Sequence, residues 1–435
     1  MNEVIEVRIW GRRVGAVMRD SKTDCHVFEY DRAWKREGVE LSPIVMPTTS
    51  RSGSFSFPTL PYETYKGLPS LLVDALPDDF GNALIDSWMM SRGLSKDRIT
   101  MIDRLSYMGS RGMGALEFRP QFSDVPDKNT HNLLQMKTLV DEARQALYGN
   151  FPDDDKKAQS LKHLISVGTS AGGARTKAVI AWNRQTQEIR SGQFDVEPDF
   201  EHWLIKFDGI GADTELGTSL DYGRIEHAYY LMAQAAGVAM MPSRLLEEGG
   251  RAHFMTKRFD RDGNTKHHIQ TLCAIDHIDF RKRETNAYES LFMVMDKLGM
   301  GNTEKSEAFR RMVLNVIAKN CDDHSKNFAF RMKQGQKWEL TPAYDVTHAY
   351  NPNGVWTYQH LMSVNSKFSN ITTEDILIVA DRFGVLEAKE ILRDVAASVG
   401  KWKEFADQSG LCEETASKIM KDFEIPRDIV GVRMK

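Results

Sequence analysis

The first 34 residues alternate between apolar and polar positions, as strands with one buried face do. VIEVRIWGRRVGAVMRD (residues 4–20) predicts two short strands joined by a turn at Gly11, and residues 26–34 continue the pattern. Residues 67–93 change to helical spacing, interrupted at Pro77. A glycine-rich turn and a strand follow in residues 108–120. The chain therefore begins with a β-rich unit that also carries helices.

The rest of the chain passes from strands to helices. Residues 121–160 are polar around one amphipathic helix, so we place a domain junction near residue 121. KAVIAWN (177–183) and EHWLIKFDG (201–209) predict neighbouring strands, and residues 220–240 predict an amphipathic helix that ends at Pro242. Beyond residue 280 most segments have helical spacing: 288–299, 305–320, 373–384 and 386–423.

Length and composition fit a folded protein of several units. A chain of 435 residues is too long to fold around one compact core. Its content of 41% hydrophobic and 27% charged residues is ordinary for globular proteins. We expect an α+β fold with units at 1–120, 121–262 and 263–435.

The net charge and the cysteine content narrow the class of protein further. A formal charge of −4 argues against a basic nucleic-acid-binding protein, although a local basic patch stays open. The four cysteines form no C-x-x-C pair, so neither a disulfide framework nor a thiolate zinc site is expected. The N-terminus lacks the layout of a signal peptide, and no apolar run is long enough for a membrane helix. We expect a cytoplasmic protein without membrane contact.

One short stretch concentrates polar groups at the start of a predicted strand. In CDDHSKNFAF (321–330), Asp322 and Asn327 have the D-x-x-x-x-N spacing of protein-kinase catalytic loops. A predicted hairpin, turning at residues 334–336, returns the chain to Asp345. Carboxylate and amide oxygens suit magnesium, which leaves positions for phosphate oxygens. The alternative is that the cluster caps the end of the preceding helix, and this stretch alone does not decide between the two.

Upstream segments add candidates for phosphate binding. Gly168, Gly172 and Gly173 precede a strand, with Arg175 and Lys177 beside them, so backbone N–H groups and cations are available to phosphates. The segment does not match the G-x-x-x-x-G-K-[ST] pattern, and a flexible hairpin loop is an equal alternative.

A lysine and a glutamate 20 residues apart complete the set. Lys206 ends a largely apolar strand, where the alternative is a surface lysine with a buried stem. Glu226 opens the next helix and is placed to pair with Lys206, although acidic residues also favour a first helical turn. Taken together, the order of these elements is the order of a protein kinase.

The chain resembles the HipA family of serine/threonine kinases, the toxins of bacterial type II toxin–antitoxin pairs. The resemblance covers nearly the whole chain, and its motifs are LPDDFGN, MGSRGMGALEF, SAGGARTK, HWLIKF, KRFDRDG, DDHSKNF and YDV. It implies a kinase-like two-lobed fold with a β-rich N-terminal subdomain and a mostly helical C-terminal lobe. It also implies ATP and Mg²⁺ as cofactors.

Residue roles follow from the resemblance position by position. Asp322 takes the place of the catalytic aspartate with His324 in the same loop, and Asn327 and Asp345 take those of the metal ligands. Lys206 matches the lysine on the ATP phosphates, with Glu226 as its partner. Ser170 matches a serine whose autophosphorylation ejects the glycine loop and inactivates the kinase. The implied ATP-binding set is Ser170, Ala171, Gly172, Gly173, Ala174, Arg175, Lys177, Lys206, Lys257, Phe259 and Lys326.

Two positions depart from the family pattern. Asp323 replaces the glycine of the usual Asp-Gly-His, which predicts an added negative charge near the ATP phosphates. Lys257 replaces the glutamate of the hinge, where backbone groups are expected to make most of the contact with the base.

The implied function is growth arrest through phosphorylation of a translation component, an aminoacyl-tRNA synthetase by analogy with other members. A helix-turn-helix antitoxin similar to HipB is the implied partner, and contact with operator DNA would be made chiefly by that partner. The alternative is a kinase-fold pseudoenzyme or corepressor that acts as a binding module with its antitoxin, a reading favoured by Asp323. A metal site at His267, His268, Cys273 and His277 is not expected, since their spacing fits no zinc pattern.

Overall fold

The computed structural model describes residues 3–122, 138, 141–142, 164, 177–208 and 221–426, except residues 21, 24, 78 and 249. Its N-terminal part (residues 3–122) is built on an antiparallel sheet in the order β4-β3-β2-β1-β5. Ile5, Val7 and Ile9 alternate with polar residues and are fully buried, which confirms the predicted strand. The strands are β1 Val4–Ile9, β2 Arg12–Asp20, β3 Cys25–Tyr30, β4 Ser54–Phe55 and β5 Leu116–Arg119.

Short helices cover this first sheet and lead into the centre of the molecule. The break predicted at Pro77 falls between α3 and α4, and Gly93 follows the end of α4 with a positive φ of 84°. Helix α5 begins with a capping box between Thr100 and Asp103. The helices of this part are α1 Arg32–Glu37, α2 Tyr62–Tyr65, α3 Ser70–Val73, α4 Asp79–Ser91, η1 Lys96–Arg98 and α5 Met101–Met108.

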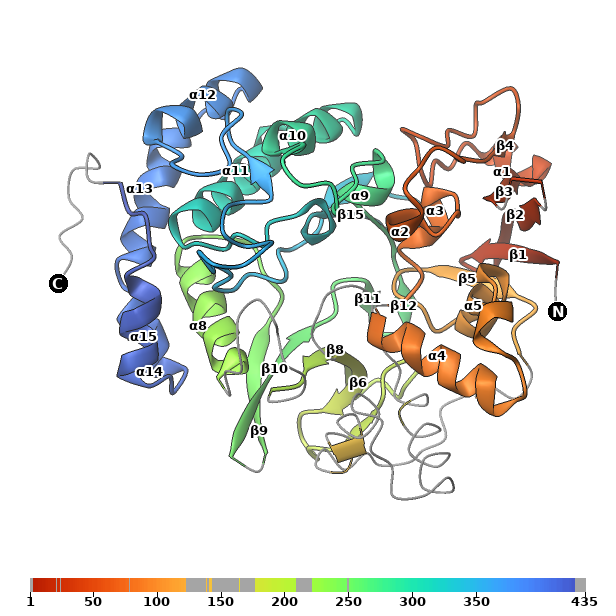
Figure 1. Cartoon of the computed structure of the whole chain (residues 1–435), viewed down its shortest axis with the longest axis horizontal. Helices are drawn as coiled ribbons and strands as arrows, with labels where there is room; N and C mark the ends of the chain where they lie inside the picture. The colour runs from red at the N-terminus through yellow and green to blue at the C-terminus, as the bar shows by residue number, and fades with distance from the viewer. Residues whose placement is uncertain are drawn as a thin grey trace.

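A second sheet, which we call the central sheet, has the order β7-β6-β8-β10-β9 and lies between the N-terminal part and the helices of the C-terminal half (Figure 1). Helix α8 packs on β10, and Gly223 permits their close approach because a Cβ there would meet the Ala252 carbonyl oxygen. The helix predicted to reach Pro242 is shorter, since it ends at Ala235 and Gly237 turns the chain with a φ of 80°. The bounds are β6 Lys177–Asn183, β7 Ile189–Ser191, β8 Phe200–Lys206, α8 Tyr222–Ala235, β9 Ser243–Glu248 and β10 Arg251–Lys257.

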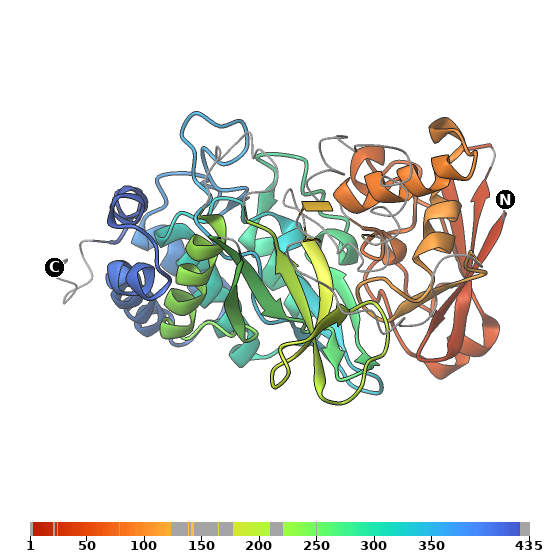
Figure 2. The same ribbon diagram turned by 90° about the horizontal axis from the view of Figure 1, so that it is seen from below.

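The C-terminal half, residues 268–426, is mostly helical, and we call it the helical lobe. The predicted hairpin is present as β15 and β16, with Gly335 in its turn at a φ of 74°. Figure 2 shows the helices α14 and α15 at the opposite end of the molecule from the N-terminal sheet. The elements after β10 are β11 Arg261–Asp262, β12 Thr265–Lys266, β13 His268–Thr271, α9 Leu272–Ile275, β14 Asn286–Ala287, α10 Tyr288–Lys297, α11 Asn302–Ile317, η2 Ser325–Asn327, β15 Ala329–Met332, β16 Trp338–Leu340, β17 Met362–Ser363, α12 Thr373–Phe383, α13 Ala388–Val399, α14 Trp402–Gln408 and α15 Glu413–Met420.

Apolar side chains form two large cores. The first contains residues of the N-terminal sheet, such as Val7 and Phe28, together with Trp203 and Ile205 of the central sheet. The second joins α8 to the helical lobe, with Tyr229, Phe292 and Phe309 fully buried. Because each core holds residues from two parts of the chain, burial of apolar area fixes the parts against each other.

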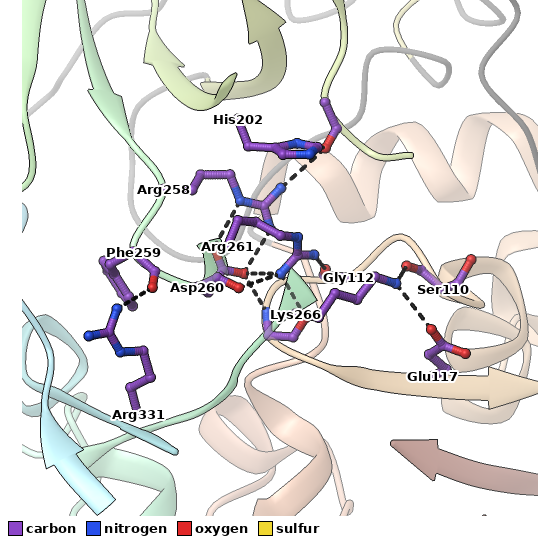
Figure 3. Close-up of polar contacts among 12 residues, drawn as sticks. Ser110, Gly112, Glu117, His202, Arg258, Phe259, Asp260, Arg261, Lys266 and Arg331 are labelled. Atoms are coloured by element: carbon purple, nitrogen blue, oxygen red, sulfur yellow. Dashed lines mark hydrogen bonds and ion pairs between the residues drawn. The ribbon is translucent and has the colours of Figure 1, made fainter. Parts of the chain in front are cut away.

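A buried ion cluster ties the N-terminal part to the end of β10 (Figure 3). The Asp260 carboxylate accepts from the Arg258 Nε at 2.9 Å, from the Arg261 Nη1 at 2.7 Å and from the Gly114 backbone N–H at 2.7 Å. Arg261 also donates to the carbonyl oxygens of Gly112 and Gly114. Burial alone raises the pKa of Asp260, but the two guanidinium groups outweigh it and hold that pKa below its usual range. The glycine-rich turn of the N-terminal part is therefore fixed to the segment that follows β10.

None of the helices within the described ranges is long and apolar enough to span a bilayer.

Candidate active site

A cleft of about 400 Å³ opens where the N-terminal part, the central sheet and the helical lobe meet. The central sheet contributes Leu204 and Lys206 from β8 and Phe254 from β10, which follow the strand alternation. All of the sequence-predicted site residues that the structure describes line it: Lys177, Lys206, Glu226, Lys257, Phe259, Asp322, His324, Lys326, Asn327 and Asp345.

Lys206 occupies the centre of the charged end of this cleft. Its Nζ pairs with the carboxylates of both Glu226 and Asp345, and its side chain is 8% exposed. The alternative of a surface lysine is therefore excluded by the structure. Burial lowers the pKa of Lys206, but Asp345 and Glu226 outweigh it and raise that pKa, so the lysine is charged.

Asp345 receives a second cation from the neighbouring strand. Lys177 is paired in register with Lys206 across β6 and β8, and its Nζ lies 3.5 Å from an Asp345 carboxylate oxygen. Burial raises the pKa of Asp345, yet the two lysines outweigh it and lower that pKa, so the carboxylate is ionised. The backbone of Asp345 has a φ of 52°, a left-handed conformation that aspartate tolerates better than most residues.

The catalytic-loop candidates lie on the floor of the cleft, in the turn before β15. Asp322 has a half-exposed side chain, and a carboxylate oxygen of it lies 3.7 Å from the His324 Nε2. The Asn327 Nδ2 donates to the Asp322 carbonyl oxygen at 2.7 Å. This bond joins the first and last residues of the D-x-x-x-x-N motif. These contacts close the loop on itself, and helix α11 ends before them at Ile317. The alternative of a helix cap is thus not what the structure shows.

Asp323 does not lie where the sequence predicted. Its side chain is fully buried inside the helical lobe. The carboxylate accepts from the Tyr288 hydroxyl at 2.8 Å, from the His360 Nδ1 at 2.9 Å and from the Leu361 backbone N–H at 2.8 Å. Asp323 is not among the described residues that line the cleft, so the charge that the sequence predicted there is instead paired with Tyr288 and His360.

The hinge candidates border the apolar end of the cleft. Lys257 ends β10, and its Nζ bonds a Glu201 carboxylate oxygen at 2.7 Å. The Phe259 ring lies 5.5 Å from the Tyr344 ring, and its carbonyl oxygen accepts from Arg331 (Figure 3). These aromatic surfaces, with Leu204 and Met241, give this end the apolar character that a purine base needs.

Sequence reasoning missed one wall of the cleft. Phe280 packs against the His324 ring at 5.2 Å, and the Lys326 Nζ lies 4.8 Å from its centroid. Arg281 lies over the Phe280 ring, and Arg281 and Trp356 also line the cleft. Their residue types carry no motif, so only the fold identifies them.

The N-terminal part contributes Asp74 to the cleft. Its carboxylate accepts from the Thr271 backbone N–H at 2.7 Å and from the Thr271 hydroxyl at 3.0 Å. Burial raises the pKa of Asp74, and Lys326 partly opposes this. No sequence signal marks this residue.

Some expected site residues lie outside the described part of the chain. These are the glycine-loop candidates Ser170, Ala171, Gly172, Gly173, Ala174 and Arg175.

The histidines and cysteine between residues 267 and 277 are engaged separately. His268 bonds the Leu41 carbonyl oxygen and His277 bonds the Ser70 hydroxyl, while Cys273 is buried. Across the described ranges, no group of three His, Cys, Asp or Glu side chains is arranged to hold a metal ion.

Comparison with known proteins places this geometry in context. The model of the HipA-like C-terminal domain matches residues 169–425, and that of the HipA N-terminal domain matches residues 5–119. A solved Shewanella oneidensis MR-1 toxin–antitoxin complex of HipA, HipB and operator DNA is similar with a TM-score of 0.64 and 18% identity, over 96% of this chain and 94% of that chain. A Helicobacter pylori proinflammatory kinase, CtkA, gives a TM-score of 0.32 and 10% identity, over 52% of this chain and 89% of that chain.

The two family models together account for the N-terminal sheet, the central sheet and the helical lobe. The fold is α+β and kinase-like, with a β-rich first part and a mostly helical last part. The chain belongs to the HipA family.

Proposed function

We propose that this chain is an ATP- and Mg²⁺-dependent protein serine/threonine kinase. The observation that carries the proposal is the convergence of Lys206, Asp322, Asn327 and Asp345 on one cleft, although 139 positions separate Lys206 from Asp345. A cation, a half-exposed carboxylate and two oxygen donors are the groups that phosphoryl transfer needs at one point.

In this proposal each residue positions one reactant. The base of ATP lies between Phe259 and the apolar side chains of the central sheet, and Lys206 holds the phosphates with Glu226 fixing the lysine. Asp322 accepts a hydrogen bond from the acceptor hydroxyl and aligns it with the γ-phosphate. Catalysis then comes mainly from orientation and from neutralising charge.

Asn327 and Asp345 would hold the magnesium ion. Both present hard oxygen atoms to the same cleft, which is the donor set that magnesium prefers. When bound, the ion neutralises phosphate charge. Lys206 and Lys177 would neutralise the Asp345 carboxylate when the ion is not bound.

The biological role that we propose is that of a toxin in a toxin–antitoxin pair. Membership of the HipA family supports it, as does the likeness to a solved protein that is complexed with HipB and operator DNA. The partner would be a helix-turn-helix antitoxin that makes most of the DNA contact. The protein substrate would be a translation component such as an aminoacyl-tRNA synthetase, in the cytoplasm, and phosphorylation of Ser170 would switch the kinase off.

The acceptor would enter along the wall formed by Phe280, Arg281 and Trp356. All three line the cleft that also contains Asp322, and the Phe280 ring lies 5.2 Å from the ring of His324 in the same loop. The alternative of a pseudoenzyme relied on Asp323, and its burial removes that argument.

The test is incubation of the purified chain with ATP and Mg²⁺, followed by intact mass and phosphopeptide mapping, with Asp322→Gln in parallel. One added phosphate on Ser170 in the wild type only is the expected result. No phosphate on a protein that was unmodified at the start, nor on any offered synthetase, would refute the kinase proposal.

A further inference from the structure

The residue after the catalytic aspartate contacts a distant segment of the helical lobe. Asp323 accepts from the backbone N–H groups of Leu361 and Met362, at 2.8 and 3.4 Å, and from the His360 Nδ1 at 2.9 Å. These three residues lie 15 to 17 positions after Asp345, in the segment that precedes and begins β17. One carboxylate thus joins the loop that contains Asp322 to the segment that contains Leu361, and both of these residues line the cleft.

This contact is buried and complete. The side chains of Asp323 and His360 are 0% and 1% exposed, so water does not weaken their attraction. The His360 Nε2 lies 3.8 Å from the Cys321 Sγ, which brings both neighbours of Asp322 into the same cluster. Because four donors, from Tyr288, His360 and the backbone of Leu361 and Met362, bind it, the Asp323 carboxylate is held in one orientation.

A chain of hydrogen bonds continues from Asp323 to the other side of the site. Asp323 accepts from Tyr288, whose hydroxyl accepts from Asn315 at 3.0 Å. The Asn315 side-chain oxygen accepts from the Asn320 Nδ2 at 3.0 Å, and that nitrogen also lies 3.4 Å from the Asp345 carbonyl oxygen. A chain of hydrogen bonds therefore connects the Asp323 carboxylate to the backbone of Asp345.

We propose that Asp323 is a positioning residue, which anchors the segment around His360 to the catalytic loop and so sets where Asp322 and Leu361 face the cleft. In many protein kinases an arginine precedes the catalytic aspartate, and phosphorylation orders a segment through arginine–phosphate pairs. Here residue 321 is a cysteine, and the Asp323 carboxylate itself binds His360 and the backbone of Leu361 and Met362. The anchor thus needs no added phosphate. This inference rests on the proposed kinase function.

The test compares Asp323→Ala and Asp323→Asn with Leu392→Ala, a control that opens a cavity in α13 of the same lobe without touching the loop. We expect Asp323→Ala to lower kcat about 100-fold, as a misplaced catalytic group does, with the KM for ATP unchanged. Asp323→Asn keeps the shape and one acceptor but not the charge, so we expect a loss of about tenfold. Leu392→Ala is expected to keep the wild-type kcat.

Amide hydrogen exchange supplies a readout that needs no turnover. Leu361 and Met362 are expected to exchange about ten times faster in the Asp323 variants and at the wild-type rate in Leu392→Ala. A kcat for Asp323→Ala equal to that of the control would overturn the proposal. Where Asp323→Ala does not fold, wild-type kcat and exchange in Asp323→Asn would overturn it. A wild type without kinase activity would instead refute the proposed function, and the exchange rates would still test the anchor.

Discussion

Asp322 and Asp323 are adjacent in the sequence, but their side chains face opposite environments: that of Asp322 is 49% exposed and that of Asp323 is fully buried. The first lines the cleft, and the second holds His360 inside the helical lobe. Two identical, adjacent side chains thus lie in different environments.

Replacing Asp322 tests the proposed chemistry. Asp322→Gln removes the carboxylate that aligns the acceptor hydroxyl, so we expect phosphoryl transfer to fall about 1,000-fold or more. The free energy of unfolding should change by no more than about 0.5 kcal/mol, because the side chain is half-exposed. Radiolabelled phosphate transfer and urea unfolding check the two expectations. A variant that keeps a tenth of the activity would contradict the assignment.

Replacing Lys206 of β8 and Lys257 of β10 in turn distinguishes phosphate binding from a structural contribution of the hinge. Lys206→Ala removes the cation at the centre of the charged end, so kcat/KM for ATP should fall about 100-fold. Lys257→Ala is the matched control, since its Nζ bonds Glu201 and we expect the hinge contact with the base to be made by backbone groups. We expect less than about a threefold change there. Equal losses in the two variants, measured by ATP titration, would argue against the role of Lys206.

The cluster at Asp260 is expected to hold the N-terminal part in place. Asp260→Asn leaves Arg258 and Arg261 buried with one neutral partner, so we expect a loss of about 3–5 kcal/mol in the free energy of unfolding. Asp262→Asn, two positions away and exposed, should cost no more than about 0.5 kcal/mol. Denaturant unfolding distinguishes the two. Similar midpoints would mean that the cluster contributes little.

The Asp323–His360 pair predicts a pH dependence of stability. Burial alone lowers the pKa of His360, but Asp323, with Cys321 beside it, raises that pKa to about 10, from 6.5 in an unfolded chain. A raised pKa stabilises the fold fully below pH 6.5, and this contribution is lost as the pH rises towards 10. His360→Gln should therefore be most destabilising near pH 6 and least near pH 10. A difference from the wild type that stays constant across this range would contradict the pairing.

The sequence by itself determined β1, β2, β5 and most of β3 in the first sheet, the hairpin after Asn327 and the helical character of the last part, whereas β4 was not predicted and residues 32–34 belong to helix α1. These features depend on local spacing, since alternating burial and turn residues act over a few positions. The sequence also determined the family, because SAGGARTK, KRFDRDG and DDHSKNF are short contiguous motifs. The spacing of Asp322 and Asn327 marked the loop that we propose as catalytic for the same reason.

Only the tertiary structure decided which side chains share a cleft and which are buried. Lys206 meets Asp345 and Asp74 meets Thr271 across separations of 139 and 197 residues, which no local pattern encodes. Helix α8 ended earlier than predicted because Gly237 adopts a positive φ, where the next segment turns back toward Ala343. Asp323 was the clearest case, because its charge was visible in the sequence, but its partners His360 and Leu361 come from a segment almost 40 residues away that folding alone brings to it.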